Sequence, residues 1–169
     1  MTGFRYISWA EYGDLTEALA EKVHSSGKAF DLVIGIARGG IPVAMVVSDR
    51  LGVKIDTITV KSYSGIAERG SIRILSTPTE DIKRKRVLLV DDLVDQGDTM
   101  IGVKGFLSEK GAKVVETAVL FKKPWSKAHP NYFLETPEEW IVFPFELSEV
   151  NRLRKARKKT LRGREKTGV

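Results

Sequence analysis

The segment from Val87 to Thr99 constrains the fold of this chain more than any other part of it. Its first four residues, 87–90, are all aliphatic, which is typical of a short strand buried in a parallel sheet. Two adjacent carboxylates, Asp91 and Asp92, follow directly, and we expect the strand to end at this pair. A glycine-containing turn over 95–99 comes next, and beyond it apolar residues recur with helical spacing. The segment therefore predicts a strand, a turn and a helix in succession.

This succession places polar groups where open α/β sheets bind ligands, beyond the carboxyl ends of the strands. Two adjacent carboxylates are costly to bury without a partner, so we expect Asp91 and Asp92 to face sugar hydroxyls or a metal ion. A turn that opens a helix offers free backbone N–H groups and the positive end of the helix dipole to an anion. The turn 95–99 is therefore expected to hold a phosphate, and the whole segment suits a sugar phosphate.

Three other classes of protein share part of this pattern. P-loop NTPases have an aspartate after a strand, but the sequence contains no G-x-x-x-x-G-K-[ST] motif. A dinucleotide-binding fold would need G-x-G-x-x-G, which is also absent. Phospho-acceptor receiver domains carry paired aspartates after their first strand, whereas this pair lies near residue 90. The remaining alternative is a solvated strand end without a function.

A second strand, turn and helix are expected between Asp31 and Gly52. The composition of the segment 31–37, which is apolar after Asp31, predicts a buried strand; Arg38-Gly39-Gly40 follows it, and Pro42 suits the first turn of a helix. The two glycines have two interpretations. They either supply positive φ in a tight turn, or they let an anion approach the backbone beside the Arg38 guanidinium. The position of this loop ahead of the acidic segment favours the anion loop.

The repeated succession predicts an α/β fold, an open and mainly parallel sheet with helices on both faces and a small C-terminal hood subdomain. Further strands are expected at 55–60, 71–75 and 114–121. An N-terminal helix over 8–26, which opens with the capping box Ser8 to Glu11, should pack on the sheet. Because parallel strands end at one edge, Arg38, the polar loop 61–70, the acidic pair and the turn 95–99 should share one crevice.

At 169 residues the chain is long enough for one domain with a substantial core. We divide it into a domain of residues 1–148, with its core at about 28–121 and the hood at about 122–148, and a basic tail of residues 149–169. The tail holds nine Lys and Arg against two Glu, so it accounts for the whole net charge of +6. The high pI therefore gives no reason to expect that the domain binds nucleic acid.

The sequence has no cysteine and no apolar run of transmembrane length. Its N-terminus lacks the order of basic and then apolar residues that marks a secretory signal. We therefore expect a cytoplasmic protein that does not contact a membrane.

The acidic segment resembles the signature of the type I phosphoribosyltransferases, which bind phosphoribosyl pyrophosphate. The resemblance covers roughly residues 30–146 and implies the fold of that family. Arg38-Gly39-Gly40 is similar to the family's pyrophosphate loop, in which the peptide before the arginine, here Ala37–Arg38, is often cis. The loop 61–70 resembles the mobile catalytic loop, and its Lys61 and Arg69 are candidates to meet the pyrophosphate.

The resemblance also implies roles for the acidic pair and the turn. Asp91 and Asp92 would hold the ribose hydroxyls and Mg²⁺, the expected cofactor. Asp95 stands where family members place a carboxylate near N7 of a purine, as a general base or to stabilise the protonated base. The 5′-phosphate would bind the turn, at Gln96, Gly97, Asp98 and Thr99. Many relatives have threonine where this chain has Gln96, and the Asp98 side chain should point away from the phosphate.

The second substrate is expected to be a purine base. Residues 121–124 and 139–146 resemble the base-binding hood of bacterial xanthine-guanine phosphoribosyltransferases. By this resemblance Lys123 meets O6 of the purine, Trp140 stacks on its ring, and the Ile141 backbone makes a further contact. A cationic donor favours a 6-oxo acceptor over a 6-amino donor. The alternatives are that Lys123 is a surface lysine and that Trp140 is a core residue.

The sequence thus predicts a purine salvage enzyme that transfers ribose 5-phosphate from phosphoribosyl pyrophosphate to guanine, hypoxanthine or xanthine and releases pyrophosphate. The catalytic candidates are Arg38, Lys61, Arg69 and Asp95. The resemblance also suggests a homo-oligomer, either a dimer or a tetramer. Two alternatives stay open. One is a nucleotide-sensing regulator on the same fold, which the basic tail would suit, and the other is a transferase for adenine, uracil or orotate.

Overall fold

The computed structural model describes residues 3–62, 72–148 and 152. The chain forms two compact units, and each is described by itself. The larger one is Asp14–Pro137, and the smaller one combines Met1–Gly13 with Glu138–Val169. None of the described helices is long and apolar enough to cross a membrane.

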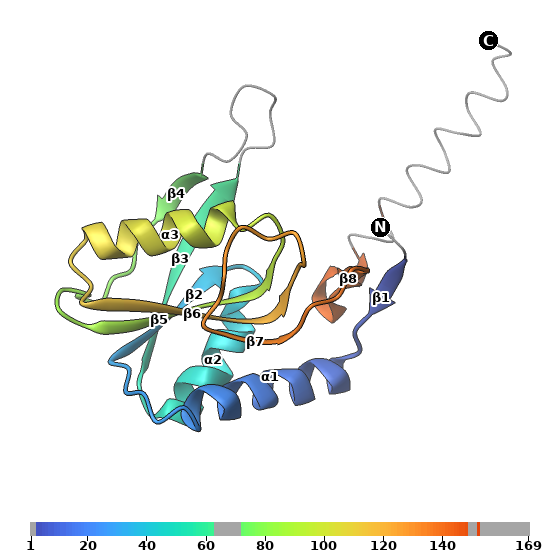
Figure 1. Ribbon diagram of the computed structural model, residues 1–169, viewed down its shortest axis with the longest axis horizontal. Helices are drawn as coiled ribbons and strands as arrows, with labels where there is room; N and C mark the ends of the chain where they lie inside the picture. The colour runs from blue at the N-terminus through green and yellow to red at the C-terminus, as the bar shows by residue number, and fades with distance from the viewer. Residues whose placement is uncertain (1–2, 63–71, 149–151, 153–169) are drawn as a thin grey trace, which may run out of the picture. The chain divides into compact units, whose positions relative to one another are not determined.

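A six-stranded sheet in the order β4-β3-β2-β5-β6-β7 forms the centre of the larger unit (Figure 1). Only the β3–β4 pair is antiparallel among these strands, and the other four pairs are parallel. The helices α2 (Gly40–Leu51) and α3 (Asp98–Glu109) cover opposite faces of the sheet (Figure 1). The predicted open, mainly parallel α/β sheet with helices on both faces is therefore confirmed. The strands are β2 (Leu32–Ala37), β3 (Lys54–Ser62), β4 (Ile72–Ser76), β5 (Arg86–Val94), β6 (Val114–Lys122) and β7 (Tyr132–Glu135).

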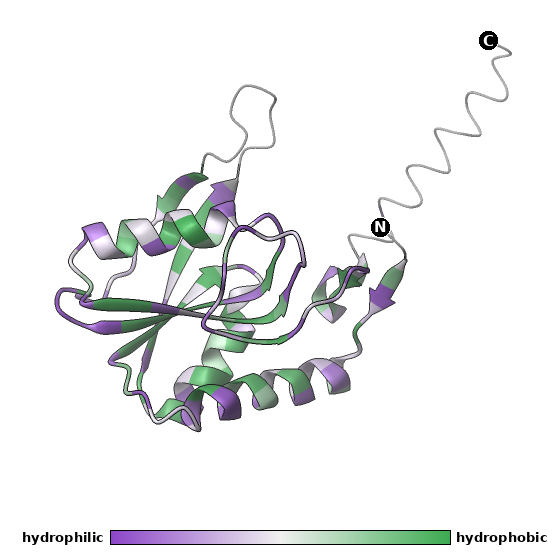
Figure 2. Ribbon diagram, in the orientation of Figure 1, coloured by the Kyte–Doolittle hydropathy of each residue, from purple (hydrophilic) through white to green (hydrophobic). Residues whose placement is uncertain are grey.

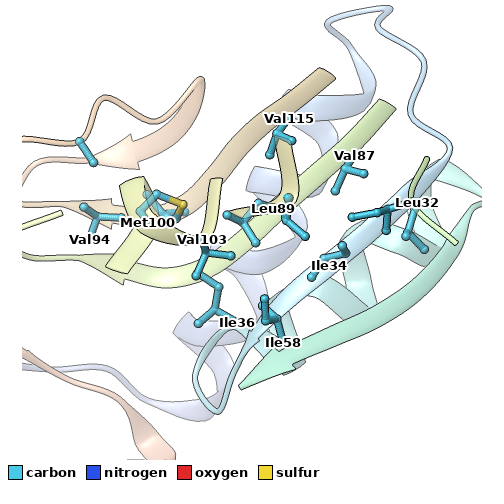
Figure 3. Packing of buried hydrophobic residues seen from close by; sticks show 14 residues of the cluster. Leu32, Ile34, Ile36, Ile58, Val87, Leu89, Val94, Met100, Val103 and Val115 are labelled. Atoms are coloured by element: carbon cyan, nitrogen blue, oxygen red, sulfur yellow. The ribbon is translucent and has the colours of Figure 1, made fainter. Parts of the chain in front are cut away.

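The core between the sheet and α3 is built from alternate residues of the central strands. Side chains of β2, β5 and β6 that are two positions apart point to the same face, where they meet the apolar residues of α3 (Figure 3). The intervening residues face α2 and are equally buried, so these strands are hydrophobic along most of their length (Figure 2). The α3 side includes Leu32, Ile34, Ile36, Val87, Leu89, Met100, Val103 and Val115.

The strand β5 extends four residues beyond Val90, so the prediction that it ends at the acidic pair is wrong. Its pairing with β2 stops at Val90, but Asp91 and Leu93 still pair with Val119 and Phe121 of β6. A strand continues as long as one neighbour offers hydrogen-bonding partners, and the long β6 offers them here. Asp91 and Asp92 therefore lie inside a strand, at the point where it continues past β2.

The ends of the other predicted elements differ by a few residues at most. The helix α1 (Trp9–His24) begins after Ser8, whose hydroxyl accepts the N–H of Glu11 at 3.1 Å, and ends two residues before the predicted end. The helix α2 ends at Gly52, which has φ of 65°. The predicted return strand is β4, antiparallel to β3. Most of the loop 61–70 that joins these two strands, including Arg69, lies outside the described residues.

The smaller unit contains a two-stranded parallel sheet of β1 (Phe4–Tyr6) and β8 (Trp140–Val142), followed by a 3₁₀ helix, η1 (Pro144–Glu146). The rings of Tyr12, Phe143 and Phe145 pack on one another with centroids 5.4 to 5.9 Å apart. The strand β1 cannot be predicted from the sequence, because its three residues are too few to show a period of two.

Replacing Leu89 tests the core. Leu89→Ala leaves a cavity between the sheet and α3, where Leu89 is fully buried, and should lower the free energy of unfolding by about 2–5 kcal/mol. Leu75→Ala is the matched control in β4, since Leu75 is exposed, and should change it by less than about 0.5 kcal/mol. Urea unfolding followed by circular dichroism measures both. Equal effects of the two changes would contradict the described core.

Candidate active site

The carboxyl ends of four strands bring most of the candidate residues to one edge of the sheet. The strands β3, β2, β5 and β6 are adjacent in this order, and their parallel pairing points their carboxyl ends the same way. Lys61 lies at the end of β3 and is exposed, and Arg38 follows β2 and is also exposed. The acidic pair lies in the last part of β5, and Lys123 follows β6.

The two glycines after Arg38 allow the β2–α2 loop to pack directly on the acidic pair. A Cβ on Gly39 would collide with the carboxylate of Asp92, and a Cβ on Gly40 would lie 2.5 Å from the carbonyl oxygen of Val90. Gly39 has φ of −62°, and Gly40 has no positive φ either. The interpretation that these glycines supply positive φ is therefore wrong, because close approach of the backbone is what requires them. The Ala37–Arg38 peptide is cis, as the resemblance implies.

The two carboxylates of the pair are held by local hydrogen bonds. Asp91 Oδ1 accepts the N–H of Asp92 at 3.0 Å, and Asp92 Oδ1 accepts the N–H of Leu93 at 2.7 Å. Desolvation, and after it the charge of Asp92, raise the pKa of Asp91 well above its ordinary value. A bound cation would offset both causes. Mg²⁺ is commonly held by one or two carboxylates together with substrate phosphates and water, so this pair fits it.

No larger metal-binding group is seen in the part of the chain that the structure describes, where no three His, Asp or Glu side chains cluster suitably. A metal at the acidic pair would therefore complete its coordination with oxygens from water or from the substrate.

The turn after β5 leaves the start of α3 open. Asp98 and Thr99 belong to the first helical turn, and Gly97, with φ of 96°, precedes it as the N-cap residue. The first N–H groups of an α-helix have no acceptor within the helix, and a glycine has no side chain with which to cap them. These groups and the helix dipole are therefore available to an anion.

The segment that joins β6 to β7 packs on this turn. The N–H of Lys127 donates to the carbonyl of Gln96 at 3.0 Å, and its ammonium pairs with Asp98 Oδ1 at 3.1 Å. A Cβ on Gly97 would lie 2.5 Å from the backbone nitrogen of Ala128, so glycine is needed here for close approach as well as for its φ. The pairing with Lys127 offsets the charge of Asp98 beside the expected phosphate.

Lys123 is a buried residue, only 4% exposed, so the alternative of a surface lysine is wrong. Its backbone N–H donates to the carbonyl of Val94 at 2.9 Å, and its ammonium donates to the carbonyl of Pro137 at 3.2 Å. The ammonium also lies 5.6 Å from the centre of the Trp125 ring. The indole N–H of Trp125 in turn donates to Asp95 Oδ1 at 2.7 Å.

Sequence reasoning missed Trp125 and Lys127. Their partners in the turn lie about 30 residues away, and no local pattern encodes such a contact. The one signal in the sequence was the position of Trp125, directly after Lys123 and Pro124 at the predicted end of a strand.

Trp140 and Ile141 lie in β8 of the smaller unit. Trp140 is 46% exposed, so the alternative of a core tryptophan is wrong, whereas Ile141 is buried. An exposed ring at this position is available for stacking on a ligand.

The model of the phosphoribosyl transferase domain family matches residues 8–151. The chain belongs to the phosphoribosyltransferase family. The xanthine-guanine phosphoribosyltransferase of Roseobacter denitrificans is 31% identical over 155 residues, which cover 85% of each chain. That of Cereibacter sphaeroides is 30% identical and covers 85% of this chain and 87% of its own. The resemblance of the acidic segment to the phosphoribosyltransferases is therefore confirmed, and the chain is a phosphoribosyltransferase.

Two solved structures are similar to this chain in fold. The purine phosphoribosyltransferase of Pyrococcus horikoshii is 36% identical, with a TM-score of 0.75 over 85% of this phosphoribosyltransferase and 94% of its own chain. A hypothetical protein from Neisseria gonorrhoeae with bound ppGpp is 27% identical, with a TM-score of 0.71 over 92% of this chain and 98% of its own.

Gly39→Ala tests the packing of the loop on the acidic pair. The added Cβ needs the space of the Asp92 carboxylate, so we expect affinity for phosphoribosyl pyrophosphate with Mg²⁺ to fall about 10- to 100-fold. Gly105→Ala is the control, because Gly105 lies in α3 with open space around its Cα and should tolerate alanine. Calorimetric titration measures both variants. Unchanged affinity in Gly39→Ala would show that the position of Asp92 does not matter for binding.

Proposed function

We propose that this phosphoribosyltransferase transfers ribose 5-phosphate from phosphoribosyl pyrophosphate to a 6-oxopurine, namely guanine, hypoxanthine or xanthine. The observation that carries the proposal is the buried ammonium of Lys123 at the end of β6, which Trp125 links to the Asp95 carboxylate. A buried cationic donor and a nearby carboxylate acceptor match O6 and a protonated N7 on one edge of an oxopurine. The names of the similar proteins from R. denitrificans and P. horikoshii support a purine acceptor.

The three parts of phosphoribosyl pyrophosphate match three adjacent parts of the sheet edge. The exposed Arg38 and the backbone around Gly39 would bind the pyrophosphate, with Lys61 and Arg69 adding positive charge. Asp91 and Asp92 would accept hydrogen bonds from the ribose hydroxyls. The 5′-phosphate would bind the open N-terminus of α3, at residues 96–99.

The reaction would be a displacement at C1 of the ribose, in which a base nitrogen forms a bond to C1 as the bond to pyrophosphate breaks. Arg38 would stabilise the charge that develops on the leaving pyrophosphate. Asp95 would accept the proton from N7 or stabilise the protonated purine. Asp91 and Asp92 would hold Mg²⁺, and the bound ion would supply further charge neutralisation at the leaving group.

The resemblance also assigns stacking on the base to Trp140 and a further contact with the base to the Ile141 backbone, and this part of the proposal rests on the resemblance alone. The cytoplasmic location expected from the sequence and the homo-oligomeric state suggested by the resemblance belong to the same proposal.

A guanine-nucleotide sensor is the second candidate function. The similar protein from N. gonorrhoeae was solved with bound ppGpp, and a site for a purine nucleotide product could also accept such a regulator. The presence of Asp95 favours the enzyme, because a sensor that only binds a nucleotide needs no carboxylate to accept a proton from the base.

Replacing Lys123 tests the choice of base. Lys123→Met keeps an apolar stem but removes the donor, so transfer to guanine and hypoxanthine should fall about ten- to hundredfold, the cost of leaving a buried acceptor unpaired. Transfer to adenine should stay low and change little. Lys122→Met is the matched control, because the Lys122 ammonium lies 5.8 Å from the Phe133 ring and away from this group of contacts. The measurement is kcat/KM with competing bases. A larger loss in Lys122→Met, or a wild-type enzyme that prefers adenine, would show that the base site is assigned wrongly.

Asp91→Asn tests the acidic pair through stability as well as binding. The raised pKa of Asp91 means that ionisation of this carboxyl destabilises the folded state. The free energy of unfolding therefore falls as the pH rises above the ordinary aspartate pKa and through the folded-state pKa. The variant should therefore unfold at a higher temperature than wild type at pH 7. The difference should vanish below about pH 3, where Asp91 is protonated in both states.

The acidic pair is also tested through binding. Asp91→Asn should weaken the binding of phosphoribosyl pyrophosphate and Mg²⁺, and the double variant with Asp92→Asn should weaken it further. Wild-type turnover in the double variant would remove the acidic pair from the proposed mechanism.

A further inference from the structure

Trp125 is in contact with both residues that the proposed function assigns to the edge of the purine. Its indole N–H donates to Asp95 Oδ1 at 2.7 Å, and the Lys123 ammonium lies 5.6 Å from its ring centroid. The indole is rigid and its N–H is a donor only, so a single hydrogen bond fixes which way the ring faces. One side chain therefore connects a carboxylate on the β5–α3 turn with a lysine that follows β6.

The two residues differ in how firmly the rest of the unit holds them. Lys123 is buried and anchored at both ends, by its backbone N–H to Val94 and by its ammonium to Pro137. Asp95 is exposed, and it lies one residue past the end of β5. The hydrogen bond from Trp125 ties this exposed carboxylate to the anchored lysine.

We propose that Trp125 is a positioning residue that fixes the Asp95 carboxylate relative to the Lys123 ammonium, so that one purine can meet both groups at once. The proposal rests on the proposed function. O6 and N7 lie on the same edge of the purine, so a base engages both protein groups only when their separation matches that of its two atoms. A carboxylate has two oxygens, and an indole on Oδ1 leaves Oδ2 to face N7.

Trp125→Phe removes the indole N–H and keeps an aromatic ring beside Lys123. The test compares guanine with 7-deazaguanine, which keeps O6 but has a C–H group in place of N7 and therefore cannot use Asp95. In Trp125→Phe the KM for guanine should rise, or kcat/KM fall, about tenfold, the value of one hydrogen bond to a charged group. The inhibition constant of 7-deazaguanine and the KM for phosphoribosyl pyrophosphate should stay within about twofold.

The KM values and the inhibition constant do not depend on the fraction of enzyme that is folded, so a partly unstable variant still gives a result. Trp9→Phe is the matched control, because Trp9 is 64% exposed in the smaller unit, and it should leave every value unchanged.

Three outcomes are distinguishable. Selective loss for guanine supports the positioning role. An equal loss for guanine and 7-deazaguanine, or no loss for either, overturns the inference and leaves the proposed function standing. A wild-type protein that transfers ribose phosphate to no 6-oxopurine overturns the proposed function, and the inference falls with it.

Discussion

The site depends first on the parallel pairing of β5 with β2 on one side and with β6 on the other. The pairing with β2 ends at Val90, whereas the pairing with β6 continues to the end of β5. As a result Asp91 and Asp92 lie beyond the last residue of β5 that pairs with β2, but they are still held in an extended strand by β6. The loop after β2 then packs against them, because Gly39 has no Cβ to occupy the space of the Asp92 carboxylate. The loop proposed for the pyrophosphate and the pair proposed for the ribose become neighbours in this way.

A second constraint acts from the other side of β5. The segment after β6 contacts the turn after β5 through backbone, charged and aromatic groups, at Gln96, Asp98 and Asp95 respectively. The same segment contains Lys123, which is anchored and buried. The groups proposed for the 5′-phosphate and for the purine are therefore fixed by one set of contacts, although they come from two loops far apart in the chain.

The sequence predicted the central sheet well, because the strands β2, β5 and β6 contain runs of buried aliphatic residues and the helices begin or end at residues such as Ser8 and Gly52. It placed the end of β5 too early, since the extension depends on a neighbouring strand and not on the residues themselves. It missed β1, which is three residues long and forms only by pairing with β8. Positive φ was one of two interpretations of Gly39, and it is wrong. The actual requirement, close approach to Asp92, is visible only in three dimensions.

Some residues of the candidate site could likewise be predicted from the sequence, and others could not. Motif residues near the carboxyl edge of the sheet, such as Arg38 after β2 and Asp91 in the last part of β5, could be named from the sequence because parallel strands share that edge. The burial of Lys123 and the contacts of Trp125 could not, since both depend on how the segment after β6 folds back on β5. Residues that position others leave little trace in a local pattern.

The most direct test of the account is a product analysis with wild-type protein, phosphoribosyl pyrophosphate, Mg²⁺ and an equimolar mixture of guanine, hypoxanthine, xanthine and adenine. Chromatography would identify each nucleotide, and a coupled assay would quantify pyrophosphate. We predict one pyrophosphate per nucleotide formed, with the nucleotides of the 6-oxopurines as nearly all of the product. Formation of AMP as the main product, or no nucleotide from any of the four bases, would contradict the account.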